Sequence, residues 1–265
     1  MKNEILSFLP TECPWRDTLY WYDTTDSTNT QAKILAKAGA PHGTVLIAGT
    51  QTGGRGRMGR SFACKPGMGV YMSILLRPKC PGETLMHLTC AAGIAGSQAV
   101  EKVCGVKPQI KWPNDLLLGG KKLGGILTEL GFDSATGLVD YAIIGIGINC
   151  NHQVADFPPE LQTIATSIQA ELGQPCSPAK LSAALMKAFY EMDCLLFTQK
   201  EVLLARYRDN CATLGQEISL IRAETSRYGK ALDIDSDGGL IVQLEDGTIE
   251  TVSSGEVSIR PKEKH

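Results

Sequence analysis

Two stretches of the chain combine residue types and spacings that could do chemistry. The first reads GGRGRMGR from Gly53 to Arg60, and the second reads KWPNDLLLGGKKLGGIL from Lys111 to Leu127. Arginines separated by glycines can form bidentate hydrogen bonds to phosphate or carboxylate while backbone amides approach the same anion. Such a loop can order over anionic substrates and exclude water from a reactive intermediate. We therefore expect an anion-binding site whose cover is the arginine-rich segment, hereafter the Arg loop.

The glycines of the Arg loop also match the dinucleotide-binding pattern G-x-G-x-x-G at Gly54, Gly56 and Gly59. That fingerprint requires a helix directly after the glycines, and Pro66 and Gly67 follow too closely for one. The chain also lacks the G-x-x-x-x-G-K-[ST] loop of many ATP-binding proteins, so a phosphate site must be built from side chains. A solvated surface loop and an RNA-binding segment remain the alternatives, although RNA-binding Gly/Arg tracts are usually longer and repeated.

Composition narrows the class of protein. With 265 residues, 43% hydrophobic and 20% charged, the chain can form one or two globular domains, and its net charge of -2 creates no global attraction to nucleic acid. Nine scattered cysteines without a C-x-x-C pair argue against a disulfide framework and against a zinc site. No signal peptide and no apolar run of membrane-spanning length is visible, so we expect a cytoplasmic protein without a membrane partner.

The elements that must position these residues follow from apolar periodicity and turn signals. Ser27 is placed as the N-cap of a helix that stops before Gly39, and the Gly119-Gly120 pair predicts a hairpin within 109–130. A helix rich in small residues at 85–103 should pack closely on a sheet. The complete prediction places helices at 28–38, 85–103, 160–172 and 178–209, and strands at 44–51, 69–78, on both sides of the hairpin turn and at 138–149.

The last fifty or so residues change character and alternate apolar with polar positions between tight turns. The prediction is an α+β domain with a mixed, mainly antiparallel sheet and flanking helices, followed by a small β-barrel. We place the domains at 1–211 and 212–265. An unpaired edge strand of the catalytic sheet could support a homodimer.

Five stretches in fixed order resemble the biotin protein ligase family: the Ser27-Thr28-Asn29 triplet, Gln51, the Arg loop, the hairpin from Lys111, and GIGIN ending at Asn149. The resemblance runs from about Thr25 to the C-terminus. It implies the class II aminoacyl-tRNA synthetase/biotin ligase-like fold with a terminal SH3-like β-barrel. It also implies a two-step reaction, in which biotin and ATP give biotinyl-5'-AMP and pyrophosphate before biotin passes to a lysine of a biotin carboxyl carrier protein, as in acetyl-CoA carboxylase.

The resemblance also implies roles for individual residues. Catalysis would rest on Arg57, Lys122 and Asp115, and Asp115 would also be the protein ligand of Mg2+. Biotin would be bound by Ser27, Thr28, Asn29, Gln51, Gly54, Arg55, Gly56, Arg57, Lys122 and Gly125. ATP would be bound by Arg57, Arg60, Phe62, Asn114, Lys122, Ile126 and Asn149.

Simpler interpretations stand beside these roles. Read alone, Ser27 is a helix N-cap, Lys122 an ordinary hairpin lysine, and the Asn114-Asp115 pair a turn. The common family pattern has Trp where Phe62 stands, and adenine stacking needs only a π face. A lipoate protein ligase, which shares the fold and the ATP chemistry, and a non-catalytic nucleotide- or RNA-binding module remain alternatives. No helix-turn-helix fits ahead of the catalytic motifs, so we expect neither DNA binding nor repressor activity.

Overall fold

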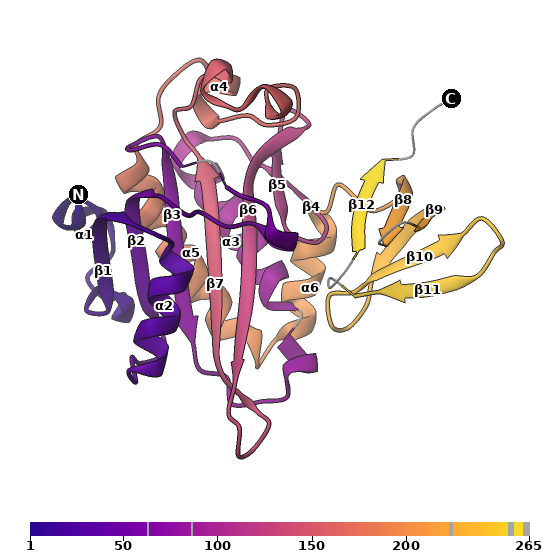
Figure 1. Ribbon diagram of the computed structural model, residues 1–265, viewed down its shortest axis with the longest axis horizontal. Coiled ribbons are helices and arrows are strands. Elements are labelled where there is room, and N and C mark those ends of the chain that lie inside the picture. The colour runs from indigo at the N-terminus through magenta and orange to yellow at the C-terminus, as the bar shows by residue number, and fades with distance from the viewer. Residues whose placement is uncertain (63, 86, 223–224, 254–256, 262–265) are drawn as a thin grey trace.

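The computed structural model describes residues 1–62, 64–85, 87–222, 225–253 and 257–261 of the chain. Figure 1 shows an N-terminal unit built on one large sheet and a smaller all-β unit at its side. The helices are α1 (Lys2–Phe8), α2 (Thr28–Lys37), α3 (His87–Cys104), α4 (Ile168–Leu172), α5 (Pro178–Leu196) and α6 (Lys200–Asp209). None of the helices in the described ranges has the length and apolarity needed to cross a bilayer.

Twelve strands form two sheets in the described residues. The large sheet contains β1 (Leu19–Thr25), β2 (Thr44–Gln51), β3 (Gly69–Leu76), β4 (Gln109–Lys111), β5 (Asp115–Leu118), β6 (Lys121–Phe132) and β7 (Val139–Asn149). The small sheet contains β8 (Glu217–Arg222), β9 (Thr225–Ile234), β10 (Leu240–Leu244), β11 (Ile249–Val252) and β12 (Val257–Pro261). Short 3-10 turns are η1 (Pro14–Arg16), η2 (Arg57–Gly59), η3 (Gly82–Leu85), η4 (Val154–Asp156) and η5 (Pro159–Leu161).

The large sheet has the order β1-β2-β3-β7-β6-β5-β4. Only β1 and β2 pair in parallel, and every other neighbouring pair in this sheet is antiparallel. The predicted mixed, mainly antiparallel sheet is therefore confirmed, and so is the hairpin, whose Gly119 and Gly120 both adopt positive φ. Strand β1 was not predicted, because its sequence LYWYDTT ends in polar residues and lacks a clean alternation.

Helices cover both faces of the large sheet (Figure 1). Helix α2 packs on one face, where Ala32 and Ala36 join Leu46, Leu75 and Ile143 in a buried cluster. Helices α3 and α5 pack on the other face, in the larger core. A Cβ placed on Gly96 of α3 would lie 2.7 Å from Leu116 Cδ1, so the small residues do permit close packing on the sheet.

Two helix predictions were wrong in extent. The segment predicted as a helix over 160–172 forms η5, then a turn and a short extended stretch in which Ala165 bridges to Lys122, and only afterwards α4. The extended stretch exists because its backbone pairs with β6, a long-range contact that local periodicity does not encode. The segment predicted at 178–209 divides into α5 and α6 at residues 197–199.

The small unit is the expected SH3-like module, with strand order β11-β10-β9-β8-β12. It contacts the large unit through the turn between β9 and β10. The Trp112 indole donates to the Gly238 carbonyl at 2.9 Å, and the Arg208 Nε lies 2.9 Å from Asp233 Oδ1. Our expected boundary after residue 211 falls between α6 and β8. The turn thereby packs against Trp112, in the segment between β4 and β5.

Candidate active site

A cavity of about 880 Å³ lies between the Arg loop, the start of α2, the β5–β6 hairpin and β7. In Figure 1 the chain that leaves β2 crosses in front of β7 and β6 to form its cover. The predicted site residues converge on this cavity from six separate stretches. Those that line it are Ser27, Thr28, Asn29, Gln51, Arg55, Gly56, Arg57, Arg60, Phe62, Asn114, Asp115, Lys122, Gly125, Ile126 and Asn149. Gly54 is the one predicted residue outside the lining.

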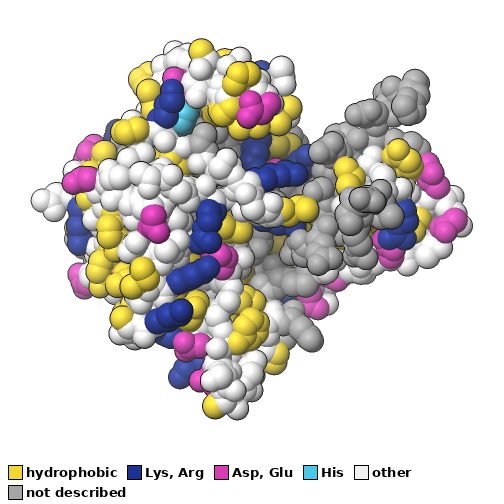
Figure 2. Space-filling model, in the orientation of Figure 1, with side chains coloured by type: hydrophobic (Ala, Val, Ile, Leu, Met, Phe, Trp, Pro, Cys, Tyr) yellow, Lys and Arg dark blue, Asp and Glu magenta, His cyan; other side chains and the backbone are white. Residues whose placement is uncertain are grey.

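The charge of the lining is strongly positive although the chain as a whole is slightly acidic. Among the described lining residues, six are basic and Asp115 is the single carboxylate. Figure 2 shows Lys and Arg side chains gathered near the centre of this face. Lys111 and Lys121 belong to this set and were not among the predicted site residues. A concave site with this charge favours anionic ligands.

The Arg loop is folded back on itself. The Gly56 amide donates to the Arg60 carbonyl at 2.7 Å, and the Phe62 amide donates to the Gly54 carbonyl at 2.9 Å. The chain reverses at Met58 and Gly59, which have φ values of 55° and 72°. A Cβ on Gly54 would lie 2.7 Å from the Phe62 carbonyl oxygen. Gly54 therefore has a structural role, because only a residue without a side chain permits this closure.

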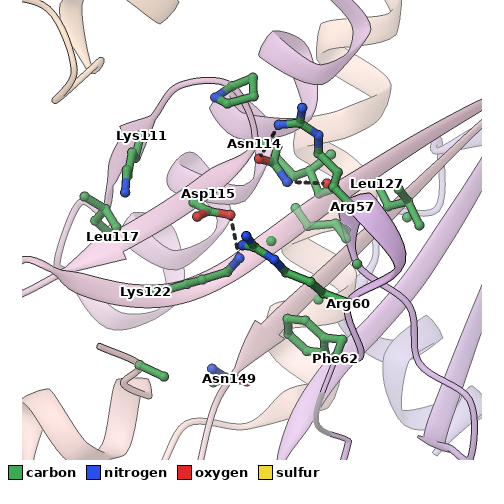
Figure 3. Close-up of a pocket in the computed structure, with 18 of the residues that line it drawn as sticks. Arg57, Arg60, Phe62, Lys111, Asn114, Asp115, Leu117, Lys122, Leu127 and Asn149 are labelled. Carbon is green, nitrogen blue, oxygen red and sulfur yellow. Dashed lines mark hydrogen bonds and ion pairs between the residues drawn. The ribbon is translucent and has the colours of Figure 1, made fainter. Parts of the chain in front are cut away.

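Arg57 connects the Arg loop to the turn between β4 and β5, which carries Asn114. Its Nη1 donates to Asn114 Oδ1 at 3.1 Å, and Asn114 Nδ2 in turn donates to the Ile126 carbonyl at 2.9 Å (Figure 3). Burial lowers the pKa of the Arg57 guanidinium, the charge of Asp115 raises it, and the nearby Arg60 charge lowers it. The guanidinium remains charged, since an arginine pKa starts far above neutral pH.

Lys122 and Asp115 face each other across the hairpin, with Nζ 2.6 Å from Oδ1 (Figure 3). A Cβ on Gly125 would lie 3.3 Å from Lys122 Nζ, so Gly125 leaves room for the ammonium. The backbone of Lys122 is fixed on its other side, where its amide donates to Ile164 and its carbonyl accepts from Thr166. The hairpin and the extended stretch together hold this lysine at the cavity.

Polar side chains at the start of α2 form a connected network. Gln51 Oε1 accepts from the Thr28 amide at 2.7 Å and from the Thr28 hydroxyl at 3.0 Å. The Ser73 Oγ lies 2.7 Å from Thr28 Oγ1 and 2.6 Å from Asn29 Oδ1. Ser27 occupies the N-cap position, but its side chain makes no capping hydrogen bond. The predicted N-cap position of Ser27 is therefore confirmed, although the side chain does not make the capping hydrogen bond and instead lines the cavity.

Arg55 is turned toward the rim of the cavity. Its Nη2 donates to Thr30 Oγ1 at 3.2 Å and lies 3.5 Å from Glu129 Oε2. Glu129 also accepts from Asn29 Nδ2 at 2.8 Å and pairs with Lys33 at 2.6 Å. Burial raises the pKa of Glu129, but the hydrogen bonds from Lys33 and Asn29 and the charge of Arg55 outweigh it and lower the pKa. Glu129 was not predicted from the sequence, because no local motif marks it.

The glycines of GIGIN make room for site residues from elsewhere. A Cβ on Gly145 would lie 2.2 Å from Asn29 Oδ1, and a Cβ on Gly147 would lie 2.7 Å from the ring of Phe62. Alternate positions of a strand share one face, so Gly145, Gly147 and Asn149 all face the cavity. Asn149 Nδ2 donates to the Thr166 carbonyl at 3.0 Å. The period-two spacing of GIGIN was the signal that could have identified both glycines.

Asp115 is the candidate ligand for Mg2+. In the described residues no group of three or more His, Cys, Asp or Glu side chains could hold a metal by itself. Mg2+ is often bound by one or two carboxylates together with substrate phosphates, so one carboxylate in a cationic cavity fits the ion. The arrangement can therefore bind two anionic groups, hold them against Lys122 and Arg57, and stabilise charge that develops between them.

Comparisons with known proteins agree with this geometry. Residues 21–149 match the "Biotin/lipoate A/B protein ligase family", and residues 213–260 match the "Biotin protein ligase C terminal domain". The chain is 37% identical to the Bifunctional ligase/repressor BirA of Bacillus subtilis over 97% of this chain and 78% of that protein. It is 31% identical to the Biotin--[acetyl-CoA-carboxylase] ligase of Mycobacterium tuberculosis over 88% of this chain and 85% of that protein.

A solved structure gives the same result. The biotin protein ligase of Aquifex aeolicus in complex with biotin and ATP superposes with a TM-score of 0.79 and 31% identity. The superposition covers 92% of this chain and 99% of that one. Sequence, domain composition and fold agree over nearly the whole chain. The chain belongs to the biotin protein ligase family.

Proposed function

We propose that this protein is an ATP-dependent ligase that forms biotinyl-5'-AMP and transfers biotin to a lysine of a biotin carboxyl carrier protein. The observation that carries the proposal is the cavity lined by six basic side chains, Lys122 and Arg57 among them, in which Lys122 pairs with Asp115. Biotin contributes a carboxylate and ATP contributes phosphates, and both anions suit this lining. The polar network of Thr28, Gln51 and Asn29 offers donors and acceptors for the neutral ureido head of biotin.

In the first step the biotin carboxylate attacks the α-phosphate of ATP and pyrophosphate leaves. Lys122 approaches both reacting groups and stabilises the negative charge that develops between them. Arg57 holds the Arg loop over the adenylate through Asn114 and keeps water away. Mg2+, held by Asp115 with the phosphates, would neutralise charge on the leaving pyrophosphate. Phe62 and Asn149 line the same cavity and would contact the adenine and ribose of the nucleotide.

The partner of the second step is the carrier domain of acetyl-CoA carboxylase or of another biotin-dependent carboxylase. We expect the chain to act in the cytoplasm, where nine reduced thiols are stable. We also propose that the described residues bind no DNA, since those ahead of β1 form α1 and η1 rather than a helix-turn-helix. We also propose that the protein can form a homodimer through an edge of the large sheet.

The decisive experiment is pyrophosphate exchange into ATP, measured with biotin, with lipoate and without an added acid. Exchange that depends on biotin supports the proposal. Exchange with lipoate alone would identify a lipoate ligase, and nucleotide binding without exchange would identify a non-catalytic module. Electrophoretic mobility of DNA fragments with the full chain tests the absence of DNA binding, and sedimentation with and without biotin and ATP tests the dimer.

A further inference from the structure

A second cavity of about 470 Å³ lies against the first. Eight of the described lining residues are common to both cavities, and among them are Arg57 and Asn114, whose hydrogen bond forms part of the shared wall. Four residues line the second cavity alone: Gly59, Thr89, Thr128 and Glu129. The second cavity therefore adjoins the first along the wall that Arg57 and Asn114 form, and it has walls of its own.

The sheet explains why this space exists. Strand β5 pairs with β6 only between Lys121 and Gly125, because β5 begins at Asp115. Beyond that point β6 pairs with β7 alone among the described strands. The gap that β5 leaves is bounded by Pro113 and Asn114 before β5, by Thr89 of α3, and by the Arg loop. A cavity beside the active site thus follows directly from the short hairpin partner.

We propose that the second cavity is the entry for the side chain of the acceptor lysine of the carrier protein. This inference rests on the proposed function, because it assigns the third substrate of the same reaction. Biotin and ATP would occupy the first cavity beneath the Arg loop, so the acceptor needs a separate approach to the carbonyl of the adenylate. The second cavity supplies that approach while the Arg loop stays closed.

The lining suits an aliphatic side chain that ends in an amine. Ile126 and Leu127 offer apolar contact to the methylene stem, and the Thr89 and Thr128 hydroxyls, 2.9 Å apart, can accept from an N–H group. Glu129, whose carboxylate also pairs with Lys33 and Arg55, is the single acidic residue in the described lining of this cavity. Arg57, deeper along the shared wall, favours loss of the proton, since a like charge disfavours the ammonium form. The amine would thus arrive at the adenylate as a nucleophile.

The transfer step balances without another reactant. The lysine ammonium first releases a proton to solvent through the open cavity. Its nitrogen lone pair then forms the amide C–N bond, the C–O bond to the phosphate breaks, and AMP leaves with that electron pair. The nitrogen releases a second proton, so the adenylate and the ammonium give the biotinyl amide, an AMP dianion and two protons.

The test narrows the second cavity from two different elements. Thr128→Phe on β6 and Thr89→Phe on α3 place a ring in it, and Thr128→Leu and Thr89→Leu are smaller fillers. Neither threonine lines the first cavity. Thr11→Phe, at an exposed position that lines neither cavity, is the matched control. Three rates are compared in the full-length protein: biotin-dependent pyrophosphate exchange, single-turnover transfer from preformed biotinyl-5'-AMP to saturating carrier domain, and reaction of the same enzyme-bound adenylate with hydroxylamine.

We expect transfer to the carrier domain to fall at least tenfold in the phenylalanine variants and less in the leucine variants. Exchange and the hydroxylamine reaction should stay within twofold of the wild type, because a small nucleophile does not need the lysine entry. Carrier transfer at the wild-type rate in folded variants overturns the inference, as does an equal loss of all three rates. Absence of biotin-dependent exchange in the wild type would instead refute the proposed function.

Discussion

The ammonium of Lys122 lies 2.6 Å from Oδ1 of Asp115, across the turn that joins β5 and β6. Asp115 is the register partner of Gly125, and the lack of a side chain at that position opens the space in which the ion pair forms. The carboxylate therefore holds the lysine at the cavity before substrates arrive. An incoming carboxylate and phosphate would compete for the same ammonium through charge-assisted hydrogen bonds of the same kind.

Replacing Lys122 with Met should slow adenylate formation, because the charge that develops on the reacting oxygens loses its preorganised cation. We expect the rate of biotin-dependent pyrophosphate exchange to fall about 100-fold or more. Lys187→Met, at an exposed position on α5 where Lys187 pairs with Glu191, is the control and should leave the rate unchanged. An exchange rate within threefold of the wild type would show that Lys122 is an ordinary hairpin residue and takes no part in adenylate formation.

Replacing Asp115 with Asn should weaken the use of Mg2+. The amide keeps the shape of the carboxylate but removes its charge, so the Mg2+ concentration that gives half-maximal exchange should rise about tenfold. The comparison is a Mg2+ titration of wild type, Asp115→Asn and Asp156→Asn, the last of which removes a carboxylate that pairs with Lys65 outside the lining. A slower exchange with an unchanged Mg2+ midpoint would mean that Asp115 acts only through Lys122.

Replacing Arg57 with Gly should release the adenylate. The substitution removes the hydrogen bond to Asn114 that closes the Arg loop, and a hydrogen bond to a charged group contributes about 1.5–3 kcal/mol. We expect biotinyl-5'-AMP to appear in solution about tenfold faster or more in a chase with unlabelled biotin. Arg227→Gly, on β9, removes an exposed partner of Glu250 and serves as the control. Retention equal to the wild type would contradict the role of the loop as a cover.

The sequence predicted the parts of this site that local chemistry encodes and missed those that arise from long-range contact. The Gly119-Gly120 turn, the Arg loop and Lys122 lie within or directly next to predicted strands, so local pattern and spacing located them. Glu129 and Ser73 gained their neighbours only when α2 was placed on the sheet. The predicted helix over 160–172 was broken for the same reason, since its backbone pairs with Lys122.

Replacing Gly147 with Ala should weaken ATP binding through Phe62. The added methyl group would lie 2.7 Å from the ring, which must move away from the face where we place adenine. We expect the KM for ATP to rise about tenfold, while the KM for biotin changes less; a loss of one good stacking contact has this magnitude. Gly147→Ala in a Phe62→Ala background is the internal control. An equal effect of the alanine in both backgrounds would show that the ring is not its target.

Replacing Glu129 with Gln should make stability less dependent on pH. The pKa of Glu129 lies below its ordinary value of 4.5 in the folded chain, so the folded state binds fewer protons than the unfolded state between these two values. The stabilisation by the carboxylate is therefore complete above about pH 4.5 and is lost as the pH falls through the lowered folded pKa.

We expect Glu129→Gln to lower the free energy of unfolding by about 1 kcal/mol at pH 7, and the difference from wild type to shrink below pH 4.5. Urea unfolding between pH 3 and pH 7 measures this, with the exposed Glu191→Gln as the control. A difference that stays constant over this range would show that the ionised carboxylate does not stabilise the contact between α2, β6 and the Arg loop.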